Sequence, residues 1–278
     1  TRPAARYRVE IYRIGWYDGA GGARVGCVPD DCAQRQGTAH SFGAPHPDTG
    51  ELAAGWPVTD AIVVPSGGRS GMYLTKLVLE SGPDEGRSAH VPFVVRGDPA
   101  RSSDVLVVVP VNTWQAYNDW GGLSTYSDPR SAVKVSFDRP YASSLRKPYL
   151  EHPVARFLDR YEWDVSYTID VEIDRDRAEL TRHALVVVPG HSEYWTKEMR
   201  DGFEAARGTG VNLVFLGGNT GYWQIRYADG PARRVLEEYR SAATDPTTNP
   251  RQTTVRWRDE PVLRPECSLL GNQWQGGD

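Results

Sequence analysis

Short apolar runs alternate with longer polar segments in the second part of the chain, and each run has the length of a buried strand. The runs cover residues 105–110, 163–168, 184–189 and 211–216. Runs of β-branched residues separated by helix-length segments are typical of the strands of a parallel sheet. The pattern therefore predicts an α/β layer fold, in which helices flank a mostly parallel sheet.

Helices are predicted in the polar segments, at residues 151–161, 196–207 and 231–240. In the first of these, Val154, Phe157 and Leu158 would share one face of a helix. The second begins after Thr196, which is a suitable N-cap residue. The third begins at Pro231, and proline is accepted in the first turn of a helix.

The first part of the chain has a different pattern. Apolar and polar side chains alternate with a period of two along residues 7–14 and along parts of 72–79 and 91–95. Such alternation indicates half-buried strands, and the Gly, Pro, Asp and Ser residues between them favour turns. We therefore predict an all-β, sandwich-like domain at residues 1–97, followed by the α/β domain at residues 98–278.

The composition carries no signature of nucleic-acid binding or of a membrane span. The chain has 278 residues and a net charge of -4, so it lacks the basic surface that binds phosphates. No apolar stretch approaches the roughly 20 residues that cross a bilayer. Because the chain begins with Thr1 and stops in a Gly-rich turn, we expect a piece of a longer protein, with the α/β domain truncated at its C-terminus.

The cysteines bear on the compartment in which the protein works. Cys27 and Cys32 lie close together in a segment rich in Pro and Asp, where they would close a small disulfide loop in an exported, extracellular protein. Free thiols in a cytoplasmic protein are one alternative. Zinc binding together with His40 and His46 is another, although the spacing departs from the usual finger pattern. We favour the disulfide, and with it a secreted protein.

Polar and aromatic residues follow three of the predicted strands, at residues 112–118, 190–195 and 217–223. Because ligands of parallel sheets bind outside the carboxyl ends of the strands, these segments should converge on one crevice. His191 and Glu193 are two positions apart, so both side chains can project into that crevice from an extended segment. The alternative is that His191 caps the sheet edge and Glu193 begins the next helix.

Two tyrosines, Tyr117 and Tyr126, flank a turn that contains the double glycine at 121–122. The glycines permit a tight reversal, so both phenols can reach a common centre. Deprotonated, and together with Glu193, they would form an all-oxygen set of ligands suited to a hard, highly charged cation. The alternative for each tyrosine is a half-buried ring with a hydrogen-bonded hydroxyl.

Motifs for other chemistries are absent from the sequence. There is no Gly-x-Ser-x-Gly elbow, no Gly-x-Gly-x-x-Gly, no phosphate-binding loop and no His-Glu-x-x-His. Cys267 lies far from any strand-to-helix elbow, so it is a poor candidate for a nucleophile. Nucleophilic catalysis and nucleotide cofactors are thereby disfavoured.

Several short segments resemble the large-subunit, or β-subunit-like, family of N,N-dimethylformamidase. They are residues 113–118, 122–126, 190–195 and 217–219, and in the first part of the chain residues 13–17 and 70–74. The order of these segments is more specific than any one of them. The resemblance implies an amide hydrolase with a mononuclear ferric ion, Fe(III), in a domain similar to the class I glutamine amidotransferase fold.

Carried over residue by residue, the resemblance implies that Tyr117, Tyr126 and Glu193 bind the iron and that His191 handles a proton. Tyr141 is an alternative to Tyr126, because the loop between them is shorter than the family leads us to expect. The leading hypothesis is therefore a metal-dependent hydrolase of the C–N bond of a small amide, such as an N-substituted formamide.

Further residues and partners follow from the same hypothesis. Asn219 would donate a hydrogen bond to the substrate or orient a ligand, although it is equally suited to a turn. A further acidic residue is expected toward the C-terminus, either beyond the end of the chain or at Glu260 or Glu266. The family's enzyme works with a small partner subunit, which is not evident in this sequence, and a homo-oligomer is an open alternative.

A second hypothesis belongs to another functional class. The chain would be an exported surface protein that binds a ligand, such as a carbohydrate, without catalysis. Exposed tryptophans would then stack on the ligand, and the candidates are Trp114, Trp120, Trp195 and Trp223. Stoichiometric iron separates the two hypotheses, because a binding module has no reason to retain it.

Overall fold

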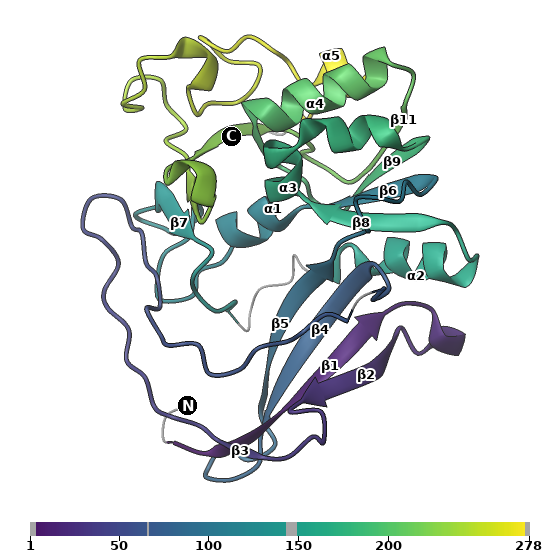
Figure 1. Cartoon of the computed structure of the whole chain (residues 1–278). Helices are drawn as coiled ribbons and strands as arrows, with labels where there is room; N and C mark the ends of the chain where they lie inside the picture. Colours follow the sequence, from purple (N-terminus) through teal and green to yellow (C-terminus); the bar gives the residue numbers. More distant parts are fainter. Residues whose placement is uncertain (1–3, 66, 143–148, 276–278) are drawn as a thin grey trace.

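Three β-sheets organise the described part of the chain in the computed structural model, which describes residues 4–65, 67–142 and 149–275. An antiparallel sheet built from the N-terminal residues lies below a parallel sheet and its helices in Figure 1. A third, mixed sheet contains β7 and lies beside the parallel one. The chain is therefore a mixed α/β protein.

The N-terminal sheet has the strand order β2-β1-β4-β5, and β3 pairs with β1. Its strands are β1 (Arg6–Ile14), β2 (Gly22–Val28), β3 (Arg35–Gln36), β4 (Gly71–Leu79) and β5 (Ser88–Val95). All its neighbours are antiparallel, and the strands predicted from the period of two are confirmed. The described residues of 1–97 form this one sheet, so the expected sandwich of two facing sheets is not confirmed.

The parallel sheet confirms the four predicted apolar strands. It consists of β6 (Val105–Val109), β8 (Val165–Ile169), β9 (Leu185–Pro189) and β11 (Asn212–Leu216), in the order β11-β9-β6-β8. The chain passes from β6 to β8 on one side and then returns to β9 on the other. The carboxyl ends of β6 and β9 therefore border the point where the strand order reverses, which is where parallel sheets bind ligands.

Helices cover both faces of the parallel sheet. They are α1 (Val111–Ala116), α2 (His152–Arg160), α3 (Asp170–Arg175), α4 (Lys197–Gly208) and α5 (Cys267–Leu270), with short 3-10 turns at Tyr17–Gly19, Arg177–Arg182, Gly230–Ala232 and Pro250–Gln252. Side chains of β6 alternate between the two cores: Leu106 and Val108 lie with those of α4, and Val105 and Val107 with those of α2. The predicted helices at 151–161 and 196–207 are confirmed, and Thr196 caps the second by accepting a hydrogen bond from the Met199 N–H.

The mixed sheet corrects one prediction. It contains β7 (Lys134–Ser136), β10 (Tyr194–Thr196), β12 (Trp223–Tyr227) and β13 (Val235–Glu237). The helix predicted at 231–240 is therefore wrong, because Pro231 lies in a 3-10 turn and β13 follows it. Leu236 is fully buried with Val135 and Ile225, and this packing, together with pairing to β7 and β12, outweighs local helix propensity.

The two parts of the chain share a core. Ile14 of β1 and Met72 of β4 belong to the same buried cluster as Val107 and Tyr167 of the parallel sheet. The predicted boundary between residues 97 and 98 stays a prediction. A similarity to the class I glutamine amidotransferase fold also stays a prediction beyond the parallel sheet and its flanking helices.

The long segment between β3 and β4 connects the N-terminal part to the mixed sheet. It runs up the side of the molecule from the N-terminal sheet toward β7 (Figure 1). The carbonyl of Thr49 accepts hydrogen bonds from the N–H groups of Val133 and Lys134, at 2.9 and 3.1 Å, and the Ala54 N–H donates to Asp138 at 2.7 Å. The described residues of this segment, 37–65 and 67–70, are called the arm below.

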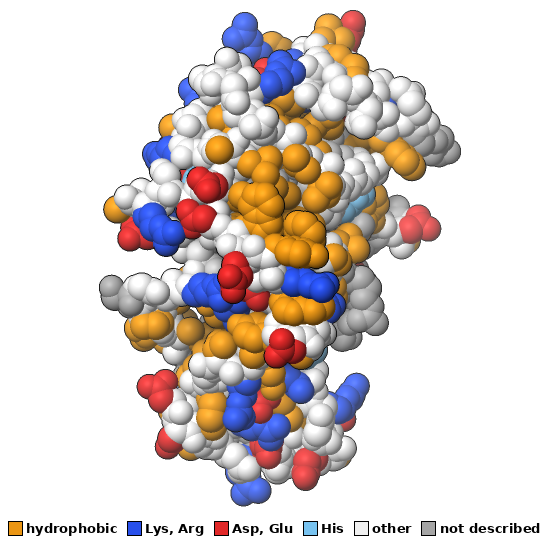
Figure 2. Space-filling view, turned by 90° about the vertical axis from the view of Figure 1, so that its right-hand side faces the viewer, with side chains coloured by type: hydrophobic (Ala, Val, Ile, Leu, Met, Phe, Trp, Pro, Cys, Tyr) orange, Lys and Arg blue, Asp and Glu red, His pale blue; other side chains and the backbone are white. Residues whose placement is uncertain are grey.

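Charges of both signs are interspersed on the molecular face seen in Figure 2, most clearly over the N-terminal sheet. Hydrophobic side chains gather in the middle of this face, at the level of α2, which exposes Phe157. No helix among residues 4–65, 67–142 and 149–275 has the length and apolar character needed to cross a membrane.

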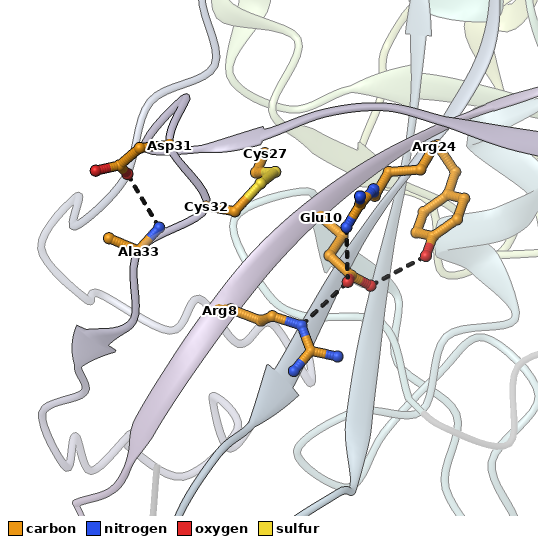
Figure 3. Close-up of a disulfide and its surroundings, with 8 residues drawn as sticks. Arg8, Glu10, Arg24, Cys27, Asp31, Cys32 and Ala33 are labelled. Carbon is orange, nitrogen blue, oxygen red and sulfur yellow. Dashed lines mark hydrogen bonds and ion pairs between the residues drawn. A yellow bond between two sulfur atoms is a disulfide. The ribbon is translucent and has the colours of Figure 1, made fainter.

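Cys27 and Cys32 form a disulfide beside the N-terminal sheet, with their Cα atoms 5.1 Å apart (Figure 3). Since both sulfurs are used in this bond, the zinc site considered from the sequence is not formed by them. Near the disulfide, Glu10 of β1 accepts hydrogen bonds from Arg8 and Tyr12 at 3.0 Å each. Cys267 is a free, exposed cysteine.

Thiol titration tests the oxidation state of the purified protein. Under denaturing conditions without reductant, we expect one reactive thiol, from Cys267, and three after reduction, because a closed disulfide hides two. A Cys267→Ser variant is the control and should give none and then two. Three thiols before reduction would show that the pair is open in the compartment from which the protein was isolated.

Candidate functional site

The candidate site lies where β6 and β9 end, at the reversal of strand order. Tyr117 is the C-cap residue of α1, the helix that directly follows β6. His191 and Glu193 lie in the turn between β9 and β10. The Glu193 N–H donates to the Thr113 hydroxyl at 3.0 Å, and this bond joins the segment after β9 to the helix after β6. The convergence predicted for these two segments is thus present.

The centre of the site is the Glu193 carboxylate, which is 1% exposed. Its Oε2 accepts a hydrogen bond from the Tyr117 hydroxyl at 2.9 Å, and its Oε1 accepts one from the Tyr126 hydroxyl at 2.6 Å. His191 Nε2 is 3.0 Å from Oε2 and 3.3 Å from the Tyr117 hydroxyl. The two tyrosine rings stack with centroids 4.3 Å apart. The structure therefore brings these four predicted residues together.

The loop from Tyr117 to Tyr126 makes the tight reversal that the double glycine predicted. Gly121 and Gly122 have φ values of 80° and 121°, which are favourable only for glycine. A side chain on Gly121 would also collide with Leu52 of the arm. At the end of the loop, the N–H and the hydroxyl of Thr125 both donate to the carbonyl of Ala116, at 3.0 and 2.9 Å. These bonds return the chain to α1 and place Tyr126 beside Tyr117.

Electrostatics keep both phenols protonated in the metal-free protein. Burial and then the negative charge of Glu193 raise the pKa of Tyr117 and of Tyr126 far above the ordinary value. The Tyr126 residue as a whole is 42% exposed, although its hydroxyl contacts the buried carboxylate. The phenols are therefore hydrogen-bond donors to Glu193, and their ionisation would require a compensating positive charge nearby.

Asn219 lies in the neighbouring turn, after β11. The two turns run side by side, because the N–H groups of Gly221 and Tyr222 donate to the carbonyls of Ser192 and Glu193 at 2.8 and 2.9 Å. Asn219 has a φ of 55° and lines a cavity of about 410 Å³. Tyr117, Tyr126, His191 and Glu193 are called the Glu193 cluster below. Within the described ranges no hydrogen bond joins the Asn219 side chain to this cluster, so the role of Asn219 in catalysis stays a prediction.

The alternative residues lie apart from the cluster. Tyr141 packs edge-on against Trp114, with ring centroids 6.4 Å apart, and burial raises its pKa to about 12. The structure thus brings Tyr126, rather than Tyr141, into hydrogen-bond contact with Glu193. Glu266 is buried, forms an ion pair with Arg258 at 2.8 Å and lines the same cavity as Asn219. Glu260 is exposed.

The sequence did not reveal a second group of residues that contacts the cluster. Arg240 donates a hydrogen bond to the Tyr194 hydroxyl at 2.9 Å. Its guanidinium carbon lies 4.4 Å from the centroid of the Tyr126 ring and 5.0 Å from that of Trp223. It also forms an ion pair with Glu238 at 3.1 Å. Burial, with a smaller effect from the nearby negative charge of Glu193, raises the pKa of Glu238 to about 7.

One signal for this group was present in the sequence. Glu238 and Arg240 are two positions apart after the apolar pair Val235-Leu236, the same spacing as His191 and Glu193. In a strand this spacing puts two side chains on one side. The helix predicted at 231–240 hid the pattern, because residues two apart in a helix do not share a face.

The tryptophans proposed as carbohydrate platforms are mostly occupied within the protein. Trp114 and Trp195 are 1% and 0% exposed, so they cannot stack on a ligand. Trp120 contacts two aromatic residues of the arm, at 4.5 and 5.6 Å between ring centroids. Trp223 is in contact with Arg240. The binding-module hypothesis is therefore not favoured.

One comparison with known proteins places the chain in a family. The family model described as N,N-dimethylformamidase beta subunit-like, C-terminal, matches residues 8–278, and the chain belongs to that family. Membership of this family suggests an amide hydrolase. A comparison with curated proteins found no match. Within the described ranges no group of three or more His, Cys, Asp or Glu residues is placed to hold a metal ion, so the candidate donor set at Glu193 depends on its two tyrosines.

An alkaline titration tests the protonation state of the two phenols. In metal-free protein, the tyrosinate absorbance that develops between about pH 8 and pH 11, where ordinary tyrosines ionise, should contain no contribution from Tyr117 or Tyr126. The double variant Tyr117→Phe/Tyr126→Phe should therefore reproduce the wild-type titration in this range. A smaller amplitude in the variant would contradict the raised pKa values of these phenols.

Proposed function

We propose that this protein is a metal-dependent hydrolase of the C–N bond of a small amide, such as an N-substituted formamide, and that it uses a mononuclear ferric ion. The observation that carries the proposal is the buried Glu193 carboxylate, which has one phenol hydroxyl on each oxygen, at 2.9 and 2.6 Å. The family supports the reaction class, since its name refers to an amide-hydrolysing enzyme.

The donor set fits a ferric ion. Tyr117, Tyr126 and Glu193 offer oxygen atoms alone, and hard, highly charged cations prefer such ligands. Ionised phenols and the carboxylate would carry three negative charges, which balance the three positive charges of Fe(III). A buried carboxylate is costly unless donors or a cation replace its lost solvation. Among the described residues, two phenol hydroxyls and the His191 ring contact this carboxylate, and a cation would compensate its charge directly.

The site also implies a division of roles. A ferric ion held by these oxygens would act as a Lewis acid on the amide carbonyl and would lower the pKa of a water molecule. His191, whose side chain is 17% exposed, reaches from the cluster toward solvent. We assign it the transfer of a proton at Nε2 to the departing amine. Asn219, from the adjacent turn, would donate a hydrogen bond to the substrate, and the products would be a carboxylate and an amine.

Iron content tests the ligand assignment. Purified wild-type protein should contain about one iron per chain and show a visible phenolate-to-iron absorption band, because an ionised phenol donates charge to a ferric centre. Tyr117→Phe, Tyr126→Phe and Glu193→Gln should each lose most of the iron. Tyr141→Phe is the matched control and should keep both iron and colour. A colourless wild-type protein that cannot take up iron would exclude this site.

Proton transfer is tested separately at His191. The His191→Ala variant should keep its iron and its visible band, while amide turnover should fall by about 10²–10⁴-fold, as expected for a lost general acid–base group. Formamide and its N-methyl and N,N-dimethyl derivatives are the first substrates to assay. If His191→Ala also loses the iron, then His191 is a ligand and the proton must be carried by another residue.

A further inference from the structure

Arg240 lies outside the predicted ligand set, yet it contacts the part of the site that is most exposed. Its guanidinium lies over the ring of Tyr126, with 4.4 Å between the guanidinium carbon and the ring centroid. We propose that Arg240 is a positioning residue, which holds the Tyr126 ring so that its hydroxyl oxygen meets Glu193. This inference rests on the proposed function, because it assigns Arg240 a role in the iron site proposed above.

Arg240 is suited to this role because its own position is fixed by several contacts. One amino group donates to the Tyr194 hydroxyl at 2.9 Å, and the Trp223 ring lies 5.0 Å from the guanidinium carbon. A planar guanidinium can stack on rings and donate hydrogen bonds at the same time. Tyr194 is fully buried, so the hydrogen bond to it connects the stacked guanidinium to the core.

Glu238 provides the counter-charge for Arg240. Its side chain is 1% exposed and lies 3.1 Å from the guanidinium. The Glu238 N–H donates to the carbonyl of Val133 at 2.8 Å, so the backbone of Glu238 is fixed next to the start of β7. A buried carboxylate without its cation is strongly destabilising. The pair therefore helps to hold Arg240 in one place, and Arg240 in turn lies against the ring of Tyr126.

The backbone of Arg240 supports a role for its side chain. Arg240 has a φ of 59°, in the left-handed region that is strained for a residue other than glycine. Glycine and asparagine adopt this conformation most readily, so an arginine at this position adds a side chain that the turn itself does not need. Arg233 has nearly the same φ, 54°, but its side chain pairs with Asp174 and donates to the Pro231 carbonyl. Within the described part of the chain it has no hydrogen bond, ion pair or ring contact with Tyr117, Tyr126 or Glu193, which makes it a matched control.

A merely structural role for Arg240 would have different consequences from a positioning role. Glycine relieves the strained backbone but removes every contact of the guanidinium. If Arg240 only turned the chain and paired with Glu238, Arg240→Gly would lose stability, because Glu238 loses its cation, but would leave the site unchanged. If Arg240 positions Tyr126, the same variant would in addition release the ring. Arg240→Lys keeps the positive charge without the planar fork and is a second variant that conserves the buried ion pair.

The test compares wild type, Arg240→Gly, Arg240→Lys and the control Arg233→Gly. Iron affinity is measured by competition with a chelator and the phenolate-to-iron band by visible spectroscopy. Removing the support of a metal ligand typically lowers metal affinity by about 10–100-fold. We expect a loss of this size and a shifted band for Arg240→Gly, a smaller loss for Arg240→Lys, and wild-type behaviour for Arg233→Gly.

A crystal structure of each metal-free protein separates this inference from the proposed function. In Arg240→Gly, or in Arg240→Lys if the glycine variant does not fold, the Tyr126 hydroxyl should no longer lie within hydrogen-bond distance of Glu193. An unmoved Tyr126 with wild-type iron affinity would overturn the role of Arg240. A wild-type protein that never binds iron would instead overturn the proposed function, while displacement of Tyr126 in the variant would still support the positioning role.

Discussion

The site is built around one buried carboxylate, that of Glu193, whose lost solvation must be replaced by other groups. Glu193 is 1% exposed, and a charge removed from water is stable only when donors or cations replace the lost solvation. The donors come from three different segments: the helix after β6, the loop that follows it and the turn after β9. Each segment is fixed by backbone or side-chain hydrogen bonds of its own, so the geometry around the carboxylate exists before any ligand arrives.

The parallel sheet brings these segments together. All five residues of β6 are buried, and alternate residues of this strand contact the two cores on opposite faces of the sheet. The strand order reverses between β6 and β9, so the chain leaves these two strands at adjacent points of the sheet edge. Strand order therefore explains how Tyr117 and Glu193 meet although they are 76 positions apart in the sequence.

The sequence predicted the parts of the site that depend on local patterns. The four apolar runs identified the parallel strands. His191 and Glu193 directly follow one of them, and Tyr117 follows another after the short helix α1. The strand β13 could not be predicted from such local patterns. Its three residues are a strand only because Leu236 reaches the core formed with β7 and β12, and such non-local packing leaves no periodic signal in so short a segment. The sequence also could not show whether the N-terminal strands form one sheet or two facing sheets. A period of two shows that one face of a strand is buried, but it does not show what covers that face.

Backbone hydrogen bonds hold the arm beside the mixed sheet. Such bonds constrain the length of the arm closely but constrain its side chains very little. On the arm side, the contacts of Thr49 and Ala54 with Val133, Lys134 and Asp138 use backbone atoms only. Any residue type can offer the same carbonyl or N–H group, except that proline lacks the latter. Homologous proteins should thus show varied side chains at these arm positions. An added or deleted residue between them, however, would shift the register of the carbonyls, so the spacing between positions 49 and 54 should vary far less than their identity.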